Sequence, residues 1–180
     1  MPFHPVNGDE VIDDHRIDQI GATPLQELEI RELNEHTKRD QLDAFLAPLL
    51  AGHDVGLISE AGCPAVADPG ADLVALAQRH GIAVVPLIGP SSLLLALMAS
   101  GLNGQRFAFH GYLPAKEAER QKELRDLEAE SRKRRQTQIF IETPYRNRQL
   151  YDAVLKTCQP ATRLTVATAL TLPGESVRTR

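Results

Sequence analysis

Apolar residues recur at two different spacings along the chain, and the changes between them predict the order of helices and strands. After Thr37, which with Asp40 resembles a helix-capping pair, five apolar residues fall on one helical face: Leu42, Phe45, Leu46, Leu49 and Leu50. Gly52 then stands at a position suited to ending this helix. The same spacing predicts a helix that stops at Gly81 and another over 93–100.

Short apolar runs rich in β-branched residues separate these helices. They predict strands over 55–58, 82–88, 106–110, 137–142 and 163–171. The run at 82–88, IAVVPLI, is continuously apolar, which is typical of a strand buried on both faces of a parallel sheet. A charged helix over 116–135, with Leu124 and Leu127 on its buried side, and an apolar-faced helix after Thr143-Pro144 complete the pattern.

The alternation of strands and helices predicts an α/β fold with a parallel or mixed sheet. We expect an irregular segment at 1–25, an N-terminal α/β domain over 26–110 and a C-terminal α/β domain over 115–180. A Gly-Tyr-Leu-Pro connector follows the first domain. Asp68-Pro69 and Thr143-Pro144 pair a capping residue with proline, and each is expected to begin a helix.

Composition and charge narrow the function classes. Hydrophobic residues make up 42% of the chain and charged residues 24%, as in globular proteins, and the formal net charge is -4, so any contact with RNA must come from a local basic patch. Two cysteines without a Cys-x-x-Cys pair argue against a zinc site and a disulfide framework, and they suit a reducing cytosol. With no signal-peptide pattern and no apolar run long enough to cross a bilayer, we expect a cytoplasmic protein.

Three loops follow predicted strands at the edge where open α/β sheets bind ligands: 59–70, 89–92 and 142–146. In the first, Glu60 offers a carboxylate to ribose hydroxyls or an amino group, and Gly62 leaves the backbone uncovered for a flat ligand. Pro64 and Pro69 stiffen this loop. A long strand-to-helix connection would look similar, and neither a Gly-x-Gly-x-x-Gly motif nor a P-loop lysine is present.

The other loops leave structural and functional interpretations open. Ser91 is expected to cap a helix, while Ser92 suits either a cap or a ligand contact. Arg146 suits a phosphate or plain solvation. The basic run at 131–135 suits RNA phosphates or the exposed end of a charged helix. The scattered histidines form neither a hydrolase triad nor a metal-binding pair, so no metal is expected.

Five segments resemble, in the same order, motifs of one known family. SEAGCPAVADPG resembles Ser-Asp-Ala-Gly-Thr-Pro…Ser-Asp-Pro-Gly, and PLIGPSSLLLALMASGL resembles a Pro-Gly-Pro-Ser segment with its helix. FAFHGYLP resembles Phe-x-Gly-Phe-Leu-Pro, FIETPYR resembles Phe-Tyr-Glu-Ser-Pro-His-Arg, and Asn34-Glu35-His36 resembles a His-Glu-His stretch. The chain is thereby similar to the tetrapyrrole methylase superfamily, in the branch of ribosomal RNA small subunit methyltransferase I.

The resemblance implies two αβα domains with mixed, mainly parallel sheets, a cleft that holds S-adenosyl-L-methionine through mostly backbone contacts, and a homodimer. Carried onto this chain, the cofactor-binding residues are Glu60, Ala61, Gly62, Pro64, Ser91, Ser92 and Thr143. The segment 166–171 is expected along the other wall of the cleft.

The chain departs from the family pattern at four places. The family's first strand with its Gly-Thr-Pro-x-Gly-Asn loop, and a following Ala-Glu-Asp-Thr-Arg segment, are not found, and the sequence stops at Arg180 before the last strands are expected. Thr-Ala-Leu-Thr at 168–171 stands in place of Arg-Glu-Leu-Thr, and Glu60 stands in place of aspartate. We therefore expect a chain shortened at both ends, with an unpaired sheet edge that favours dimerisation.

The implied reaction moves a methyl group to a ribose 2′-hydroxyl of ribosomal RNA. A hydroxyl is a poor nucleophile, so a general base is expected, and His36, Glu35 and Glu142 are the candidates. Two alternatives remain at this stage. The same fold supports methylation of a small molecule such as a tetrapyrrole, which the acidic net charge favours, and the missing elements favour a non-catalytic binding module.

Overall fold

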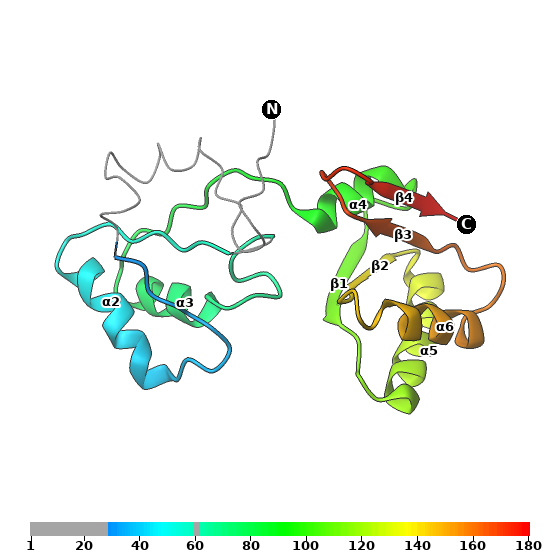
Figure 1. Ribbon diagram of the computed structural model, residues 1–180, viewed down its shortest axis with the longest axis horizontal. Coiled ribbons are helices and arrows are strands. Elements are labelled where there is room, and N and C mark those ends of the chain that lie inside the picture. Colours follow the sequence, from blue (N-terminus) through cyan, green and yellow to red (C-terminus); the bar gives the residue numbers. More distant parts are fainter. Residues whose placement is uncertain (1–28, 60–61) are drawn as a thin grey trace. The chain divides into compact units, whose positions relative to one another are not determined.

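The computed structural model describes residues 29–59 and 62–180, in which two compact units are distinguished, Met1–Pro90 and Ser91–Arg180 (Figure 1). The α/β class is confirmed, with helices in both units and one parallel and one antiparallel strand pair in the second. The structure groups residues 91–110 with those that follow. The division into domains at 26–110 and 115–180 stays a prediction.

The described part of the first unit is built on helix packing. A 3₁₀ turn, η2 (Arg39–Gln41), leads into α2 (Leu42–Leu50), and α2 packs against α3 (Ala71–Arg79). Helical spacing places the buried residues Leu42 and Leu46 on one helix and Leu73 and Ala77 on the other. The predicted cap at Asp68 is wrong, because the chain continues through Gly70, with φ of 128°, before α3 begins.

The strands predicted over 55–58 and 82–88 are wrong. Both segments are extended without ladder pairing to any described residue of their unit. The apolar run at 82–88 is largely exposed, with Val85 at 74% and Ile88 at 97%. A strand of this composition needs neighbours at both edges and cover on both faces, and the described chain supplies neither.

The second unit contains a βαβ arrangement. Strand β1 (Phe107–Tyr112) runs parallel to β2 (Thr137–Ile141), and α5 (Glu117–Arg134) connects them. Phe107 lies opposite Thr137, and the register shifts between Phe109 and Tyr112. Helix α6 (Asn147–Thr157) follows β2 and packs against α5. The carboxyl ends of β1 and β2 therefore share one edge.

A second strand pair closes this unit. Helix α4 (Ser92–Ser100) packs on β4 (Ser176–Thr179), which pairs antiparallel with β3 (Thr165–Thr168). The single strand predicted over 163–171 is wrong at its end, because Ala169 and Thr171 adopt left-handed backbone angles, φ 51° and 67°, and turn the chain.

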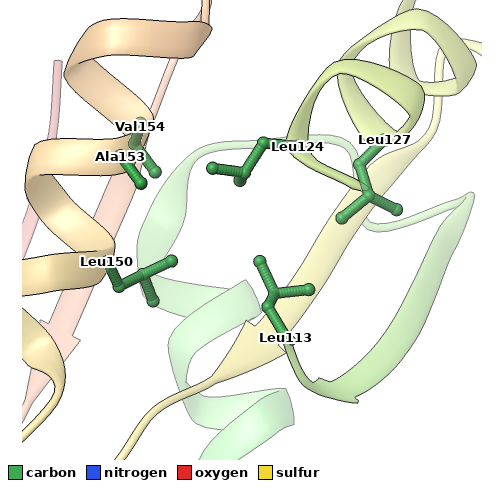
Figure 2. Packing of buried hydrophobic residues seen from close by; sticks show 6 residues of the cluster. All are labelled: Leu113, Leu124, Leu127, Leu150, Ala153 and Val154. Carbon is green, nitrogen blue, oxygen red and sulfur yellow. The ribbon is translucent and has the colours of Figure 1, made fainter. Parts of the chain in front are cut away.

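The core of the second unit joins α5 and α6 to the end of β1. Figure 2 shows six buried side chains that converge there: Leu113, Leu124, Leu127, Leu150, Ala153 and Val154. Phe140 of β2 and the partly buried Cys158 and Leu164 pack against them. Fully burying a leucine side chain contributes roughly 1.5–3 kcal/mol, so this cluster holds both helices to the parallel pair.

Candidate functional site

The edge at the carboxyl ends of β1 and β2 carries a buried ion pair. The Glu142 side chain, which is 4% exposed, directs Oε2 to within 3.0 Å of Arg146 NH2. Its Oε1 accepts a hydrogen bond from the Thr143 backbone N–H at 2.9 Å. Arg146 NH2 also donates to the Leu113 carbonyl at 2.9 Å, so one guanidinium joins the two strand ends. We call this set of contacts the Glu142 clasp.

The contacts of the clasp bear on whether Glu142 acts as a general base or as a structural residue. Oε1 accepts the Thr143 N–H, whereas the buried Oε2 forms an ion pair with Arg146 but accepts no hydrogen bond within the described chain. A general base needs a lone pair directed at the substrate proton. Its burial and its ion pair with Arg146 favour a structural role for Glu142, which orders the loop at 142–146.

Thr143 lies in this loop but does not cap α6. The residue at the N-cap is Arg146, and the Thr143 carbonyl accepts the Arg146 N–H at 3.0 Å in a separate turn before the helix. The predicted cap at Thr143 is therefore wrong. Its half-buried hydroxyl lies 3.4 Å from Glu142 Oε1. Its predicted contact with the cofactor stays a prediction.

Arg120 organises the segment after β1 and was not identified from the sequence. This residue is 4% exposed, and its NH1 donates to the carbonyls of Pro114 at 3.2 Å and Ala115 at 2.7 Å. Its position at i relative to Leu124 at i+4 and Leu127 at i+7 was the available signal, because these three residues share the buried face of α5. The side chain fixes the path of the chain beside the clasp.

The two serines at the start of α4 have exposed or half-exposed positions. Ser91 occupies the N-cap with φ of −119°, as predicted, and its carbonyl accepts the Leu95 N–H at 2.9 Å. Within the described chain its side chain makes no capping hydrogen bond, so the expected capping contact is not formed. Ser92 is the first residue of the helix and is exposed. Both hydroxyls can therefore serve a ligand.

A shallow cavity of about 310 Å³ lies beside the second half of α4. It is lined by Leu95, Met98 and Ala99 of the helix and by Leu170, Thr171 and Glu175 of the loop between β3 and β4. Glu175 Oε2 accepts the Thr171 N–H at 2.7 Å, which holds this β-branched residue in its left-handed conformation. This cavity was not predictable from sequence patterns, because its two walls are distant in the chain.

The loop at 62–70 in the first unit is tightly turned. Gly62 has φ of 86°, and a Cβ there would meet no described atom within 4 Å. The half-buried Pro64 follows Cys63, whose Sγ lies 3.7 Å from the Pro90 carbonyl oxygen. The positive φ and open surroundings of Gly62 agree with a loop that exposes its backbone. Glu60 and Ala61, the first two predicted contacts, lie outside the described residues.

Glu35 and His36 sit in an exposed turn. The Asn34 side-chain oxygen accepts the His36 N–H at 2.9 Å, and Thr37 Oγ1 accepts the Asn34 N–H at 3.0 Å. His36 Nε2 lies 3.7 Å from Glu35 Oε1, and both side chains are more than four fifths exposed. The imidazole is thus accessible, and the Glu35 carboxylate lies beside it.

The described residues contain no cluster of three or more histidine, cysteine, aspartate or glutamate side chains that would hold a metal ion. Nor does any described helix have the length and apolarity needed to cross a membrane. Cys63 and Cys158 are free thiols. Burial, and then the nearby Glu128 charge, raise the pKa of Cys158, which favours the neutral thiol.

Comparison with known proteins supplies the remaining finding. The family described as Tetrapyrrole (Corrin/Porphyrin) Methylases matches residues 9–180. Similar proteins named ribosomal RNA small subunit methyltransferase I come from Pseudomonas aeruginosa, 46% identical over 63% of this chain and 39% of the relative, and from Escherichia coli O157:H7, 35% identical over 81% and 49%. The protein of that name from Mesorhizobium japonicum is 39% identical over 81% and 48%. The chain thus spans half or less of the length of these relatives.

Proposed function

Because the chain belongs to the tetrapyrrole (corrin/porphyrin) methylase family, we propose that it acts as an S-adenosylmethionine-dependent methyltransferase on a ribose 2′-hydroxyl of small-subunit ribosomal RNA. The observation that carries the proposal is the similarity to ribosomal RNA small subunit methyltransferase I, at 35% identity across 81% of this chain. The five motif segments resemble that branch, and this resemblance indicates the ribose 2′-hydroxyl as the acceptor of the methyl group.

The residues present suit the cofactor. No described atom lies within 4 Å of the place where a Cβ of Gly62 would stand, and the Ser91 hydroxyl makes no capping bond within the described chain. Ser92 adds an exposed position at the start of α4. Bound S-adenosylmethionine would supply a methyl group already activated on a sulfonium. We propose that the residues that hold it are Glu60, Ala61, Gly62, Pro64, Ser91, Ser92 and Thr143.

The protein's own contribution would be alignment and proton removal. Holding donor and acceptor in line lowers the entropic part of the barrier without covalent help from the protein. We propose His36 as the general base, because its exposed imidazole is accessible to a ribose hydroxyl and Glu35 Oε1 lies 3.7 Å from its Nε2. The clasp would keep the 142–146 loop ordered around Thr143.

We further propose that the chain forms a homodimer and acts in the cytoplasm. The exposed apolar side chains of the 82–88 segment support association, since such a run is unfavourable in water. The two free thiols support a reducing compartment. Light scattering of the purified chain tests the first point: a dimer is expected, and a monodisperse monomer contradicts it.

Transfer of a labelled methyl group from S-adenosylmethionine to small-subunit ribosomal RNA tests the proposed activity. We expect label that stays in RNA fragments resistant to alkaline cleavage, because a methylated 2′-oxygen cannot attack the adjacent phosphate. Label in a tetrapyrrole but not in RNA would support the small-molecule alternative instead. A folded chain that transfers no label to either would support a binding module.

A further inference from the structure

Six exposed cations gather from three segments at the edge where β1 and β2 begin. The amino-edge basic surface consists of Arg106, Arg132, Lys133, Arg134, Arg135 and Arg163. Four of them form the end of α5, and this run was noted in the sequence. Arg106 and Arg163 are distant in sequence from this run, and only the fold brings them to this edge.

Hydrogen bonds attach Arg106 to the end of α5. The Thr137 N–H donates to the Arg106 carbonyl at 2.9 Å, and the Asn103 side-chain amide donates to the Arg135 carbonyl at 2.7 Å. Thr137 Oγ1 also donates to the Asn103 carbonyl at 2.9 Å. The segment before β1 and the segment before β2 are therefore held together, and each contributes arginine.

Glu128 attaches the turn that carries Arg163. Its carboxylate accepts the Gln159 N–H at 2.8 Å and the Thr162 hydroxyl, so the turn after α6 is fixed against the last turns of α5. Arg132 NH2 lies 3.1 Å from the same carboxylate. Because Arg163 follows Thr162 directly, its backbone lies next to this fixed point, and its side chain is exposed.

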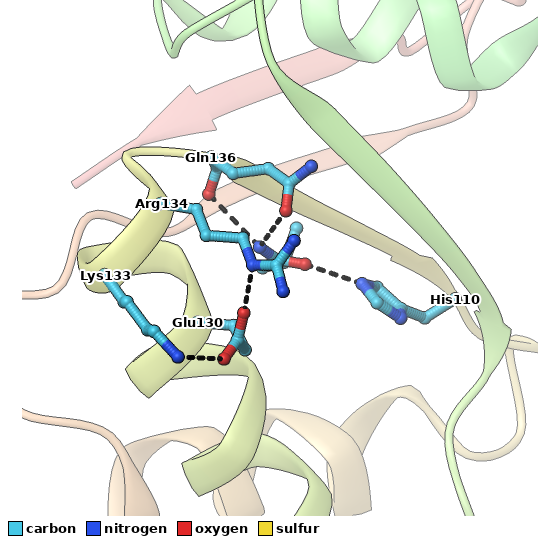
Figure 3. Close-up of polar contacts among 6 residues, drawn as sticks. His110, Glu130, Lys133, Arg134 and Gln136 are labelled. Atoms are coloured by element: carbon cyan, nitrogen blue, oxygen red, sulfur yellow. Dashed lines mark hydrogen bonds and ion pairs between the residues drawn. The ribbon is translucent and has the colours of Figure 1, made fainter.

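The surface keeps a positive balance after its local ion pairs are counted. Figure 3 shows Lys133 and Arg134 converging on the single carboxylate of Glu130, while His110 and Gln136 contact Gln138 nearby. Glu128 and Glu130 are the carboxylates of the 128–136 segment, and they pair with Arg132, Lys133 and Arg134. Within the described chain, the other three cations of the surface form no ion pair, although the formal net charge of the chain is -4. The α5 dipole favours cations in its last turn but does not account for Arg106 or Arg163, which lie outside that helix.

We propose that the amino-edge basic surface binds the phosphodiester backbone of an RNA arm at a distance from the methylated ribose. This inference rests on the proposed ribosomal RNA substrate. Five of the six cations are arginines, whose planar forks match phosphate oxygens. The 131–136 segment, SRKRRQ, contains no apolar side chain of the kind that an interfacial helix inserts into a membrane.

The position of this surface gives it a distinct role. It lies at the opposite end of β1 from the loop at 142–146, and a strand of six residues spans roughly 20 Å. It therefore contacts RNA away from the reacting ribose and contributes affinity and orientation without sequence readout.

A pair of matched triple variants tests the proposal. Arg106→Gln, Lys133→Gln and Arg163→Gln together remove three charges from the surface. Lys122→Gln, Arg148→Gln and Lys156→Gln together remove three charges elsewhere in the same unit, where each cation faces a carboxylate, at 3.1, 3.3 and 3.7 Å respectively. Binding of a fluorescent small-subunit ribosomal RNA fragment is measured by anisotropy from about 50 to about 200 mM salt, after equal thermal stability of the variants is verified.

We expect the surface variant to lose at least about tenfold in affinity, and the slope of log affinity against log salt to fall by about 2 in magnitude. The control variant should bind like the original chain. Equal losses in both variants, no loss in the surface variant, or no RNA binding by the original chain would each overturn the proposal. So would a surface variant that loses only binding to phosphatidylserine vesicles.

Cofactor binding separates this proposal from the proposed function. If the original chain binds S-adenosylmethionine and methylates RNA but the surface variant binds RNA unchanged, only the basic surface is rejected. If the original chain binds no cofactor but the surface variant still binds RNA more weakly than the original chain, the proposed RNA-binding surface is kept and the proposed methyltransferase activity is rejected.

Discussion

Arg146 holds the buried carboxylate of Glu142, with Oε2 and NH2 3.0 Å apart, and the same guanidinium donates to the carbonyl of Leu113. These contacts fasten the loop after β2 to the chain leaving β1. The pair thereby links local sequence, four residues apart, to the geometry of the edge where α/β folds bind ligands.

Removing Arg146 should destabilise the protein strongly. Arg146→Ala leaves Glu142, 4% exposed, without its cation, and breaking such a pair costs about 3 kcal/mol. Urea unfolding measures the effect. Adding Glu142→Gln to Arg146→Ala should recover part of the loss, because the unpaired charge is removed. A loss in Arg146→Ala below about 0.5 kcal/mol, the range of ordinary surface changes, would show that the clasp does not hold the loop.

The candidate bases should separate in a methyl-transfer assay. His36→Ala is expected to lower the rate of methyl transfer about 10²-fold, because the substitution removes the proposed proton acceptor. Stability should change little, because the His36 side chain is exposed. Glu142→Gln should mainly lower stability, because it removes the buried charge that pairs with Arg146. Full activity in His36→Ala, Glu35→Gln and Glu142→Gln alike would exclude all three as the base.

Glu128 should make stability depend on pH in the acid range. Burial raises the pKa of this carboxyl, but hydrogen bonds from Thr162 and Gln159 and the Arg132 charge outweigh it, so the pKa lies below the ordinary 4.5. The carboxylate therefore contributes stability above about pH 4.5 that is lost as the pH falls through the lower folded-state pKa.

Urea unfolding of Glu128→Gln and the original chain from neutral to acid pH measures this contribution. The original chain should be more stable at pH 7, and the difference should shrink towards zero as the pH falls below 4.5. A difference that stays constant with pH would mean that the Glu128 contacts do not depend on its charge.

Gly70 should not tolerate a side chain. Its φ is +128°, and an added Cβ would lie 2.7 Å from Leu57 Cδ2. Gly70→Ala is expected to destabilise the first unit by about 1–3 kcal/mol through backbone strain, with a further steric part. Leu57→Ala in the same chain should relieve only the steric part. Thermal unfolding measures both, and an unchanged melting temperature in Gly70→Ala would refute the tight approach of this loop to Leu57.

Helix positions followed from the sequence because their apolar spacing reflects local geometry. The buried residues Leu42 and Leu46, and later Leu124 and Leu127, lie on the predicted faces. The helix starts were less predictable, because turns stabilised by their own hydrogen bonds displace the starts of α3 and α6 from Asp68 and Thr143.

Features that depend on distant partners were not predictable. The 82–88 run has the composition of a buried strand, but its conformation depends on neighbours that the sequence pattern does not supply. The cavity beside α4 needs Leu170 and Glu175 from a hairpin loop, and Arg163 joins the basic surface only through Glu128. In each case the deciding contact spans residues too far apart for periodicity to reveal.

Calorimetric titration of the purified chain with S-adenosylmethionine and S-adenosylhomocysteine tests the central claim most directly. We predict binding near the micromolar level, which corresponds to about 8 kcal/mol. The affinity should fall when Ser91 and Ser92 are replaced by alanine in a chain that remains folded. Heat of dilution alone from a folded sample would contradict the proposed methyltransferase activity.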